Sequence, residues 1–466
     1  MSAEPSSPAA RSSARARIPR RACLTWAAAL AASAVPLTMR APAWATGRLP
    51  VGGRIALHLP WPIATLDPHR IDDAAAALLG DALFDGLYAL DAAGAVVPVL
   101  AESDPEADRG SLRIVLRAGL RSALDRPIEA RDVVQSVARA RASGARGWLA
   151  EIPPPREAGK GAIVFATRDA AALTRALASP LVAVVPASFN PGAPDGTGPF
   201  RAERRGEALV LVRNPRAARG PAFLDEIAVR ASADLAGSLR AFEAGADDVG
   251  WLGSGLHEPR AGARTFDAGA VAWAVLRTGK EAGAWDAPGI AQRIADGLPP
   301  SRLAYLVLGP PWRTDPEEGW GGGACDLIVR DDAPWLIELA RAVAATIARP
   351  LHPVGVRPVS PAELAQRRAS RAFALAVDVV RPLAPTALGA FVALATADDP
   401  SSVVDVARHA PRLGAVFNVR ALPRTMRLGV LGEIRAQGAR MGDLSVATSP
   451  SGGLDLGAIT RARRAP

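Results

Sequence analysis

The sequence predicts an α/β protein, and three observations lead to that class. Short apolar segments with strand-like alternation are interleaved with longer segments in which apolar residues recur every three to four positions. The chain has 466 residues, of which 49% are hydrophobic, so it can build more than one core and is not disordered throughout. We find no internal repeat of 20 to 50 residues, which argues against a solenoid or a propeller. Mixed strands and helices without a repeat are typical of α/β folds.

The first elements follow in chain order. Residues 55–59 predict a strand that ends at Pro60. Leu79, Leu83 and Leu87 are spaced by four residues and predict one apolar face of a helix.

Three further elements come later in the chain. Alternating apolar residues over 112–116 predict a half-buried strand. Residues 129–142 predict a helix that turns Val133, Val134 and Val137 inward, and residues 336–347 predict a second helix. Aspartate pairs are expected at loop or helix edges, where solvated capping is their ordinary use. These pairs are 72–73, 247–248, 331–332 and 398–399.

Residues 1–45 have the three parts of a secretory signal peptide. A basic stretch ends at Arg20-Arg21, an apolar run follows, and the segment closes on Ala43-Trp44-Ala45. The run is too short to span a bilayer and is broken by Pro36. The paired arginines resemble a twin-arginine signal. We therefore expect an exported, periplasmic protein that begins at Thr46, with the general or the twin-arginine route left open.

The charge distribution argues against a nucleic-acid partner. Six arginines against Glu4 give residues 1–45 a net charge of +5, which leaves +4 of the total +9 for the rest. Lys160 and Lys280 are the two lysines of the chain, and each stands apart from any basic stripe.

The residue types needed for metal binding or catalysis are sparse. The two cysteines are Cys23, in the signal segment, and Cys325, so the mature chain has no disulfide and no cysteine-based metal site. The five histidines are scattered singly, and no Gly-x-Ser-x-Gly elbow occurs. We therefore expect no metal, no cofactor and no enzyme activity.

Several segments stand in a characteristic order along nearly the whole mature chain. They are Thr65-Leu66-Asp67-Pro68-His69-Arg70, Leu83-Phe84-Asp85-Gly86-Leu87-Tyr88, Val97-Pro98-Val99-Leu100-Ala101-Glu102-Ser103, Ile128-Glu129-Ala130-Arg131-Asp132-Val133-Val134-Gln135-Ser136, Gly196-Thr197-Gly198-Pro199-Phe200, Arg213-Asn214-Pro215 and Leu224-Asp225-Glu226-Ile227. In order and spacing they resemble extracellular solute-binding protein family 5, the peptide/nickel-type receptors of ABC importers.

This resemblance implies a two-lobed periplasmic-binding-protein fold, class II and cluster C in type, with an inserted small domain. We expect lobe I at 46–70, 180–270 and 422–466, the small domain at 71–179, and lobe II at 271–421. The resemblance also implies a small-molecule or peptide-like ligand and, as partners, the permease subunits of an ABC transporter in the inner membrane. We expect a monomer.

The resemblance also indicates where a ligand would bind. Peptide-binding members hold the α-amino group of the peptide with an acidic residue of a second-lobe block, and Arg381 takes that position here, three residues after Asp378. A guanidinium there predicts a ligand with an acidic group. Trp273 and Arg277 are expected at the same edge of the cleft, with Trp251 approaching from lobe I.

Alternatives remain at both levels. Arg277 and Arg381 would be solvated surface charges, and Trp251 and Trp273 core residues, if the cleft lies elsewhere. For function, the alternative is a degenerate family member that acts as a sensor or accessory partner without transport. An exported hydrolase is a more remote alternative.

Overall fold

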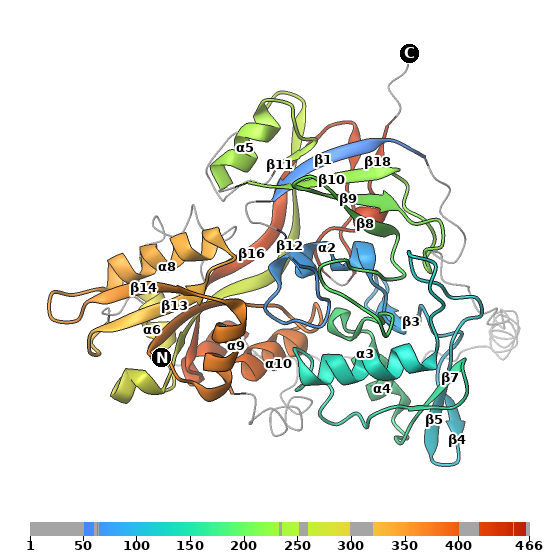
Figure 1. The fold of residues 1–466 in the computed structure, drawn as a ribbon, viewed down its shortest axis with the longest axis horizontal. Coiled ribbons are helices and arrows are strands. Elements are labelled where there is room, and N and C mark those ends of the chain that lie inside the picture. Colours follow the sequence, from blue (N-terminus) through green and yellow to red (C-terminus); the bar gives the residue numbers. More distant parts are fainter. Residues whose placement is uncertain are drawn as a thin grey trace, which may run out of the picture. The chain divides into compact units, whose positions relative to one another are not determined.

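A ten-stranded mixed sheet runs through the protein (Figure 1). The computed structural model describes residues 51–59, 63, 65–232, 235–250, 260–298, 320–399, 419–450 and 452–462. In spatial order the strands are β14 (Val354–Val359), β13 (Cys325–Arg330), β15 (Leu375–Val380), β12 (Ala263–Thr278), β16 (Leu428–Met441), β11 (Val249–Gly250), β1 (Arg54–Leu59), β10 (Glu226–Ala231), β9 (Ala208–Arg213) and β8 (Phe200–Arg205).

Strands β12 and β16 are the long strands of this sheet and connect its two ends. We call β11, β1, β10, β9 and β8 the first half-sheet, and β13, β14 and β15 the second half-sheet. At its start near Ala263, β12 pairs with the end of β16, and that end of β16 also pairs with β11. From Trp273 to Thr278, β12 pairs with β15 as well as with β16. The β12–β16 register is irregular between Asp267 and Ala272, where Gly269 has a φ of 88°.

The second half-sheet is covered on both faces. Its strands β13, β14 and β15 are parallel to one another, and alternate residues of β13 belong to different apolar clusters. Leu327 and Val329 pack with α8 (Pro334–Ile347) in the main core, and Ile328 packs with α9 (Pro361–Ser370) in a smaller one. Burial on both faces is typical of parallel strands.

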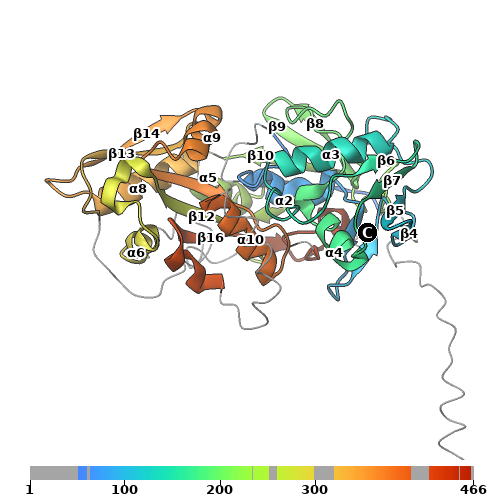
Figure 2. The same ribbon diagram turned by 90° about the horizontal axis from the view of Figure 1, so that it is seen from below.

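A second, four-stranded sheet lies outside the large one (Figure 2). Helix α3 (Ala130–Ala142) packs against β6 and β7 of this sheet, and α4 (Ala170–Leu177) packs against the β2–β3 hairpin. The strands are β4 (Glu106–Asp108), β5 (Ser111–Val115), β7 (Ala162–Phe165) and β6 (Arg156–Glu157), and the hairpin is β2 (Tyr88–Leu90) with β3 (Val96–Pro98). All of these elements fall within the range 71–179, although the domain boundaries themselves stay a prediction.

The remaining helices and short elements lie outside the two sheets and the β2–β3 hairpin. The helices are α2 (Ala74–Leu83), α5 (Leu235–Glu243), α6 (Ile290–Asp296) and α10 (Ala387–Asp398), and the short elements are η1 (Pro180–Val182), η2 (Lys280–Trp285), η4 (Val419–Thr425), η5 (Leu456–Ala458) and the β17–β18 pair (Leu444–Ser445 and Thr460–Arg461). Among the described residues, no helix is long and apolar enough to cross a membrane.

The predicted elements are confirmed with two corrections, of which the smaller is that Val134 is half-buried whereas Val133 and Val137 are buried. Strands occupy 54–59 and 111–115, and helices occupy 130–142 and 334–347. The helix predicted from the leucine spacing ends at Leu83, so the inclusion of Leu87 was wrong. The chain is extended directly after the helix, from Phe84, and Asp85 forms an isolated β-bridge with Val184. Gly86 is packed closely, because a Cβ there would lie 2.9 Å from the Tyr88 carbonyl oxygen and 3.1 Å from the Leu177 carbonyl oxygen.

The segments that carry the resemblance meet in space. Gly198 donates its amide to the Leu83 carbonyl at 3.0 Å, and a Cβ at Gly198 would lie 2.5 Å from the Leu83 carbonyl carbon. The Thr197 hydroxyl donates to Asp85 at 2.9 Å, and the Asn214 side chain donates to the Gly198 carbonyl at 2.9 Å. Three motif blocks that are distant in sequence therefore form one packed junction.

Candidate functional site

Three of the predicted site residues share one face of the sheet. Trp273 and Arg277 lie four residues apart on β12, and Asp378 lies on β15 directly opposite Val275. Their side chains therefore emerge on the same side. All three are buried, with Arg277 7% exposed and Asp378 fully buried. Trp251 lies outside the described residues.

Arg277 and Asp378 belong to a chain of alternating charges. Arg277 lies 3.2 Å from Asp378, whose Oδ2 also accepts from Arg368 of α9 at 2.6 Å. The other end of the Arg368 guanidinium donates to Asp72 at 2.7 Å. Asp72 in turn accepts from Arg70 at 2.8 and 3.1 Å. The network Arg70–Asp72–Arg368–Asp378–Arg277, which we call the charge relay, runs from the start of α2 to the second half-sheet.

Arg381, just after β15, is engaged by backbone groups. Its side chain donates to the carbonyls of Arg70 at 3.1 Å and Ala76 at 3.3 Å, and its amide donates to the Ile71 carbonyl at 2.7 Å. Arg381 is 4% exposed. Arg277 and Arg381 are therefore buried, and the alternative that they are solvated surface charges is wrong. The same alternative placed Trp273 in the core, and Trp273 is indeed buried.

A small cavity of about 40 Å³ lies beside the charge relay. One wall is the chain that leads into α2, with Asp72 and its capping neighbour Asp73. The opposite wall is the turn from β13 into α8, with Arg330, Asp332 and Trp335. The first wall leads into α2, which packs against β8 of the first half-sheet and against β12, and the second wall belongs to the second half-sheet. The remaining lining residues are Thr65, Ala74, Ala75, Ala333, Leu336 and Val379.

The charged groups of the cavity are paired with one another. Arg330 donates from two nitrogens, Nε and Nη2, to the two carboxylate oxygens of Asp332, with the Nη2 bond at 2.7 Å. Its third nitrogen, Nη1, donates to the Asp72 carbonyl at 3.1 Å. The Asp73 carboxylate caps α2 by accepting from the Ala76 amide at 2.8 Å. An arrangement of carboxylates and guanidinium groups of this kind suits a polar solute whose charged group can take the place of one partner in such a pair.

Burial and charge shift the titration of the two aspartates in opposite directions. Burial alone would raise the pKa of Asp72, but the positive charges of Arg368 and Arg70 outweigh it and lower the pKa. For Asp73, burial dominates and raises the pKa. Asp72 is therefore held as a carboxylate by its arginines.

Three buried polar atoms of the predicted residues lack a hydrogen-bond partner within the described part of the chain. They are Nε of Arg277, Oδ1 of Asp378 and Nε of Arg381. Unsatisfied buried polar atoms are unusual in folded proteins. One acceptor and two donors are thus available around the charge relay.

Sequence reasoning missed Asp72, Arg330 and Arg368. Solvated capping was expected of Asp72, Asp73 and Asp247, and this was wrong, because all three are buried. Asp73 caps α2, Asp72 pairs with Arg70 and Arg368, and Asp247 pairs with His58. The position of Asp72 two residues after the block that ends at Arg70 was the available signal. Arg368 lies on a helix that offered no functional motif, and it meets Asp72 across 296 residues of sequence.

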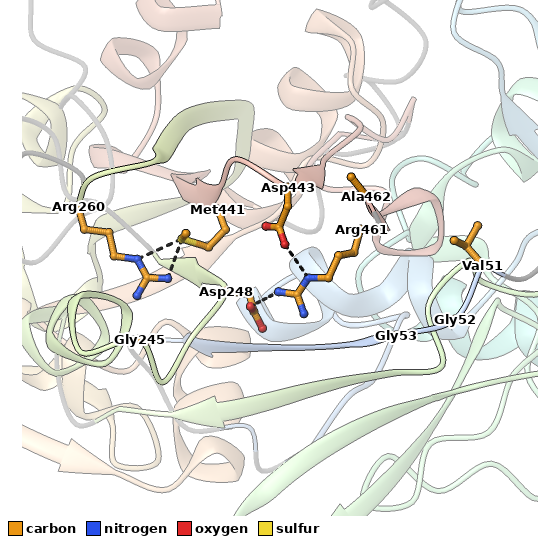
Figure 3. Close-up of a pocket in the computed structure, with 10 residues that line it drawn as sticks. All are labelled: Val51, Gly52, Gly53, Gly245, Asp248, Arg260, Met441, Asp443, Arg461 and Ala462. Atoms are coloured by element: carbon orange, nitrogen blue, oxygen red, sulfur yellow. Dashed lines mark hydrogen bonds and ion pairs between the residues drawn. The ribbon is translucent and has the colours of Figure 1, made fainter. Parts of the chain in front are cut away.

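A larger hollow of about 600 Å³ lies elsewhere, beside the start of β1 and the ends of β16 and β18 (Figure 3). Arg461 binds Asp248 and lies 3.3 Å from Asp443 there, and Arg260 donates to the Met441 sulfur and the Phe242 carbonyl. Arg461 thus takes both carboxylates of this hollow, whereas Arg260 is held by uncharged groups. Within the described ranges, no group of three His, Cys, Asp or Glu side chains could hold a metal ion.

Comparison with known proteins identifies the fold. No family model and no curated protein matches the sequence. Among solved structures, the pheromone receptor PrgZ is 13% identical with a TM-score of 0.66, covering 89% of this chain and 100% of PrgZ. The protein AgaA from A. tumefaciens R10, in complex with agropinic acid, is 16% identical with a TM-score of 0.64, covering 89% of this chain and 99% of AgaA.

A third similar structure is the oligopeptide-binding protein AppA from Bacillus subtilis, in complex with a nonapeptide. It is 13% identical with a TM-score of 0.64, covering 89% of this chain and 100% of AppA. The likeness therefore extends over nearly the whole of each chain. The chain has the α/β fold of the two-lobed substrate-binding proteins.

Proposed function

We propose that the mature protein is an exported receptor that captures a small polar solute between its two half-sheets and delivers it to the permease subunits of an ABC importer. The observation that carries this proposal is the cavity whose walls come from the start of α2 on one side and the β13–α8 turn on the other. The shared fold supports it, since the solved relatives named above include proteins in complex with small or peptide ligands.

Entry of a solute requires the halves to separate. A cavity of about 40 Å³ has room for about one water molecule. The irregular stretch of β12 around Gly269 is the place where the strands that join the halves are least regularly paired. We place the hinge there, and a solute then shifts the balance toward closure by its greater affinity for the closed form.

Arg330 is the residue that we assign to the acidic group of the solute. Its guanidinium lines the cavity between Asp332 and the Asp72 carbonyl, whereas Arg381 is not among the lining residues and donates to the carbonyls of Arg70 and Ala76. Arg381 is then a positioning residue, and Arg277 and Asp378 supply polar atoms around the charge relay. Trp273, on the same face, and Trp251 remain candidate ligand contacts from the sequence. The protein releases its solute unchanged, and we propose no turnover.

Export rests on residues 1–45 as a signal peptide and places the receptor in the periplasm. N-terminal sequencing of the exported protein should return Thr46. Export through the twin-arginine route should stop when Arg20 and Arg21 are both changed to Lys, and unchanged export of that variant would assign the general route.

Native mass spectrometry of the protein purified from its own compartment tests the proposal. We expect one small polar molecule per chain, released on denaturation. Protein that never carries a molecule, and binds none from a cell extract after gentle removal of any ligand, would contradict a receptor function.

A further inference from the structure

Arg368 lies between two carboxylates that belong to different parts of the fold. One nitrogen of its guanidinium donates to Asp72 at 2.7 Å, and another donates to Asp378 at 2.6 Å. Asp72 precedes α2, which packs against β8 of the first half-sheet, and Asp378 lies on β15 of the second. Arg368 of α9 therefore joins carboxylates of both halves, whereas Arg330 and Arg381 reach the same segment through its backbone carbonyls.

Arg368 is presented to this position by a rigid helix. The Ser360 side chain caps α9 by accepting from the Glu363 amide at 3.2 Å, and the neighbouring Arg367 pairs with Glu363 at 2.8 Å within the same helix. Leu364 anchors α9 in the apolar cluster against β13. The side chain of Arg368 is 19% exposed, so its two ion pairs are largely shielded from solvent.

We propose that Arg368 is an internal latch that holds the two halves of the protein together when no solute is bound. The latch regulates the site of the proposed function, and it rests on that proposal only for the identity of the site. A planar guanidinium can donate to two carboxylates at once through separate nitrogens, which suits it for this bridging role.

The remainder of the charge relay makes the latch reversible. When Arg368 moves away, Asp72 still has Arg70 at 2.8 Å and Asp378 still has Arg277 at 3.2 Å. Neither carboxylate is then left without a counter-charge, so opening does not incur the full cost of an unpaired buried charge.

The latch also slows the capture of solute, because only the opened fraction admits it. The observed association rate falls in proportion to that fraction. An incoming solute has to be able to replace the contacts that Arg368 makes or to bind beside them.

Distance measurements between spin labels test the latch without any solute. Labels at Glu207→Cys, in the exposed turn between β8 and β9, and at Leu351→Cys, in the exposed turn before β14, mark opposite edges of the ten-stranded sheet. Cys325→Ser removes the native thiol of the mature chain. Arg368→Ala is compared with Arg367→Ala, its neighbour on α9, and near-UV circular dichroism verifies that each variant is folded.

We expect one narrow distance distribution for the solute-free parent. In Arg368→Ala the ratio of open to closed molecules should rise roughly tenfold or more, as loss of charge-assisted hydrogen bonds implies. Arg367→Ala should have the same ratio of open to closed molecules as the parent. Arg368→Lys keeps the charge but cannot donate to two carboxylates from separate nitrogens of one planar group, so its ratio should lie between those of the parent and Arg368→Ala. Millimolar n-propylguanidinium should restore the narrow distribution in Arg368→Ala.

An Arg368→Ala distribution that coincides with the parent overturns the latch, as does an equal change in Arg367→Ala or a failure of n-propylguanidinium to restore closure. Since no solute is present, these outcomes are independent of whether a transported ligand is ever found.

Discussion

Asp85 offers a direct test of the junction where the motif blocks meet. Its carboxylate is buried, lies 2.5 Å from Nε of Arg219 and accepts from the Thr197 hydroxyl at 2.9 Å. Burial would lower the pKa of Arg219, but the charges of Asp85 and other aspartates raise it, which indicates a strongly stabilised guanidinium. Asp85→Asn keeps the shape of the side chain and removes its charge.

The expected loss follows from what the substitution leaves behind. Removing one partner of a buried ion pair costs about 3–5 kcal/mol. Arg219 keeps its hydrogen bond to the Asp81 carbonyl at 2.9 Å, and its side chain is 20% exposed, so we expect the lower part of that range or slightly less, about 2–4 kcal/mol. The matched control is Asp125→Asn, because Asp125 pairs with Arg121 and Arg216 but is 52% exposed. Exposed pairs contribute about 0–1 kcal/mol.

Urea unfolding of the chain from Thr46, followed by far-UV circular dichroism and tryptophan fluorescence, gives both free energies of unfolding. A loss in Asp85→Asn that equals the loss in Asp125→Asn would refute the reasoning. The junction would then owe its stability to packing alone and not to the buried pair.

Two other predictions concern stability. In Gly80→Ala the added methyl group has no neighbour within 4 Å, so this change in α2 should raise the free energy of unfolding by about 0.4–1 kcal/mol. In Gly198→Ala the methyl group would collide with Leu83, so the free energy of unfolding should fall. Urea unfolding midpoints measure both changes. Burial lowers the pKa of His69, whose Nε2 donates to Ala183, so the unfolded chain takes up the proton first. Stability should therefore fall as the pH drops below about 6.5, and His69→Gln should lose that part of the dependence when unfolding is compared at pH 7.5 and 5.5.

The sequence predicted elements well where periodicity is local. The apolar stripe of 336–347 and the strand before Pro60 are set by neighbouring residues, and both are confirmed. The end of α2 at Leu83 was not predictable in this way, because the extended chain that follows it pairs with Val184, which is distant in sequence.

The candidate site was predicted only in part, for a related reason. Arg277 and Asp378 were assigned to one edge of a cleft, and the structure pairs them. Arg368 and Asp72 were overlooked because isolated charges in a sequence read as surface charges unless their partners are known. Their pairing depends on the tertiary fold, which brings α9 against the start of α2.

The most direct test of the account is the affinity of the identified solute for Arg330→Ala, measured by calorimetry beside Arg341→Ala. Arg330 lines the cavity, whereas Arg341 lies on the exposed side of α8 and pairs with Glu338 of the same helix. Loss of a charge-assisted hydrogen bond to the solute should weaken binding to Arg330→Ala roughly 10- to 100-fold, and Arg341→Ala should bind as the parent does. Equal affinity in the two variants would mean that the solute does not bind between the half-sheets at this cavity.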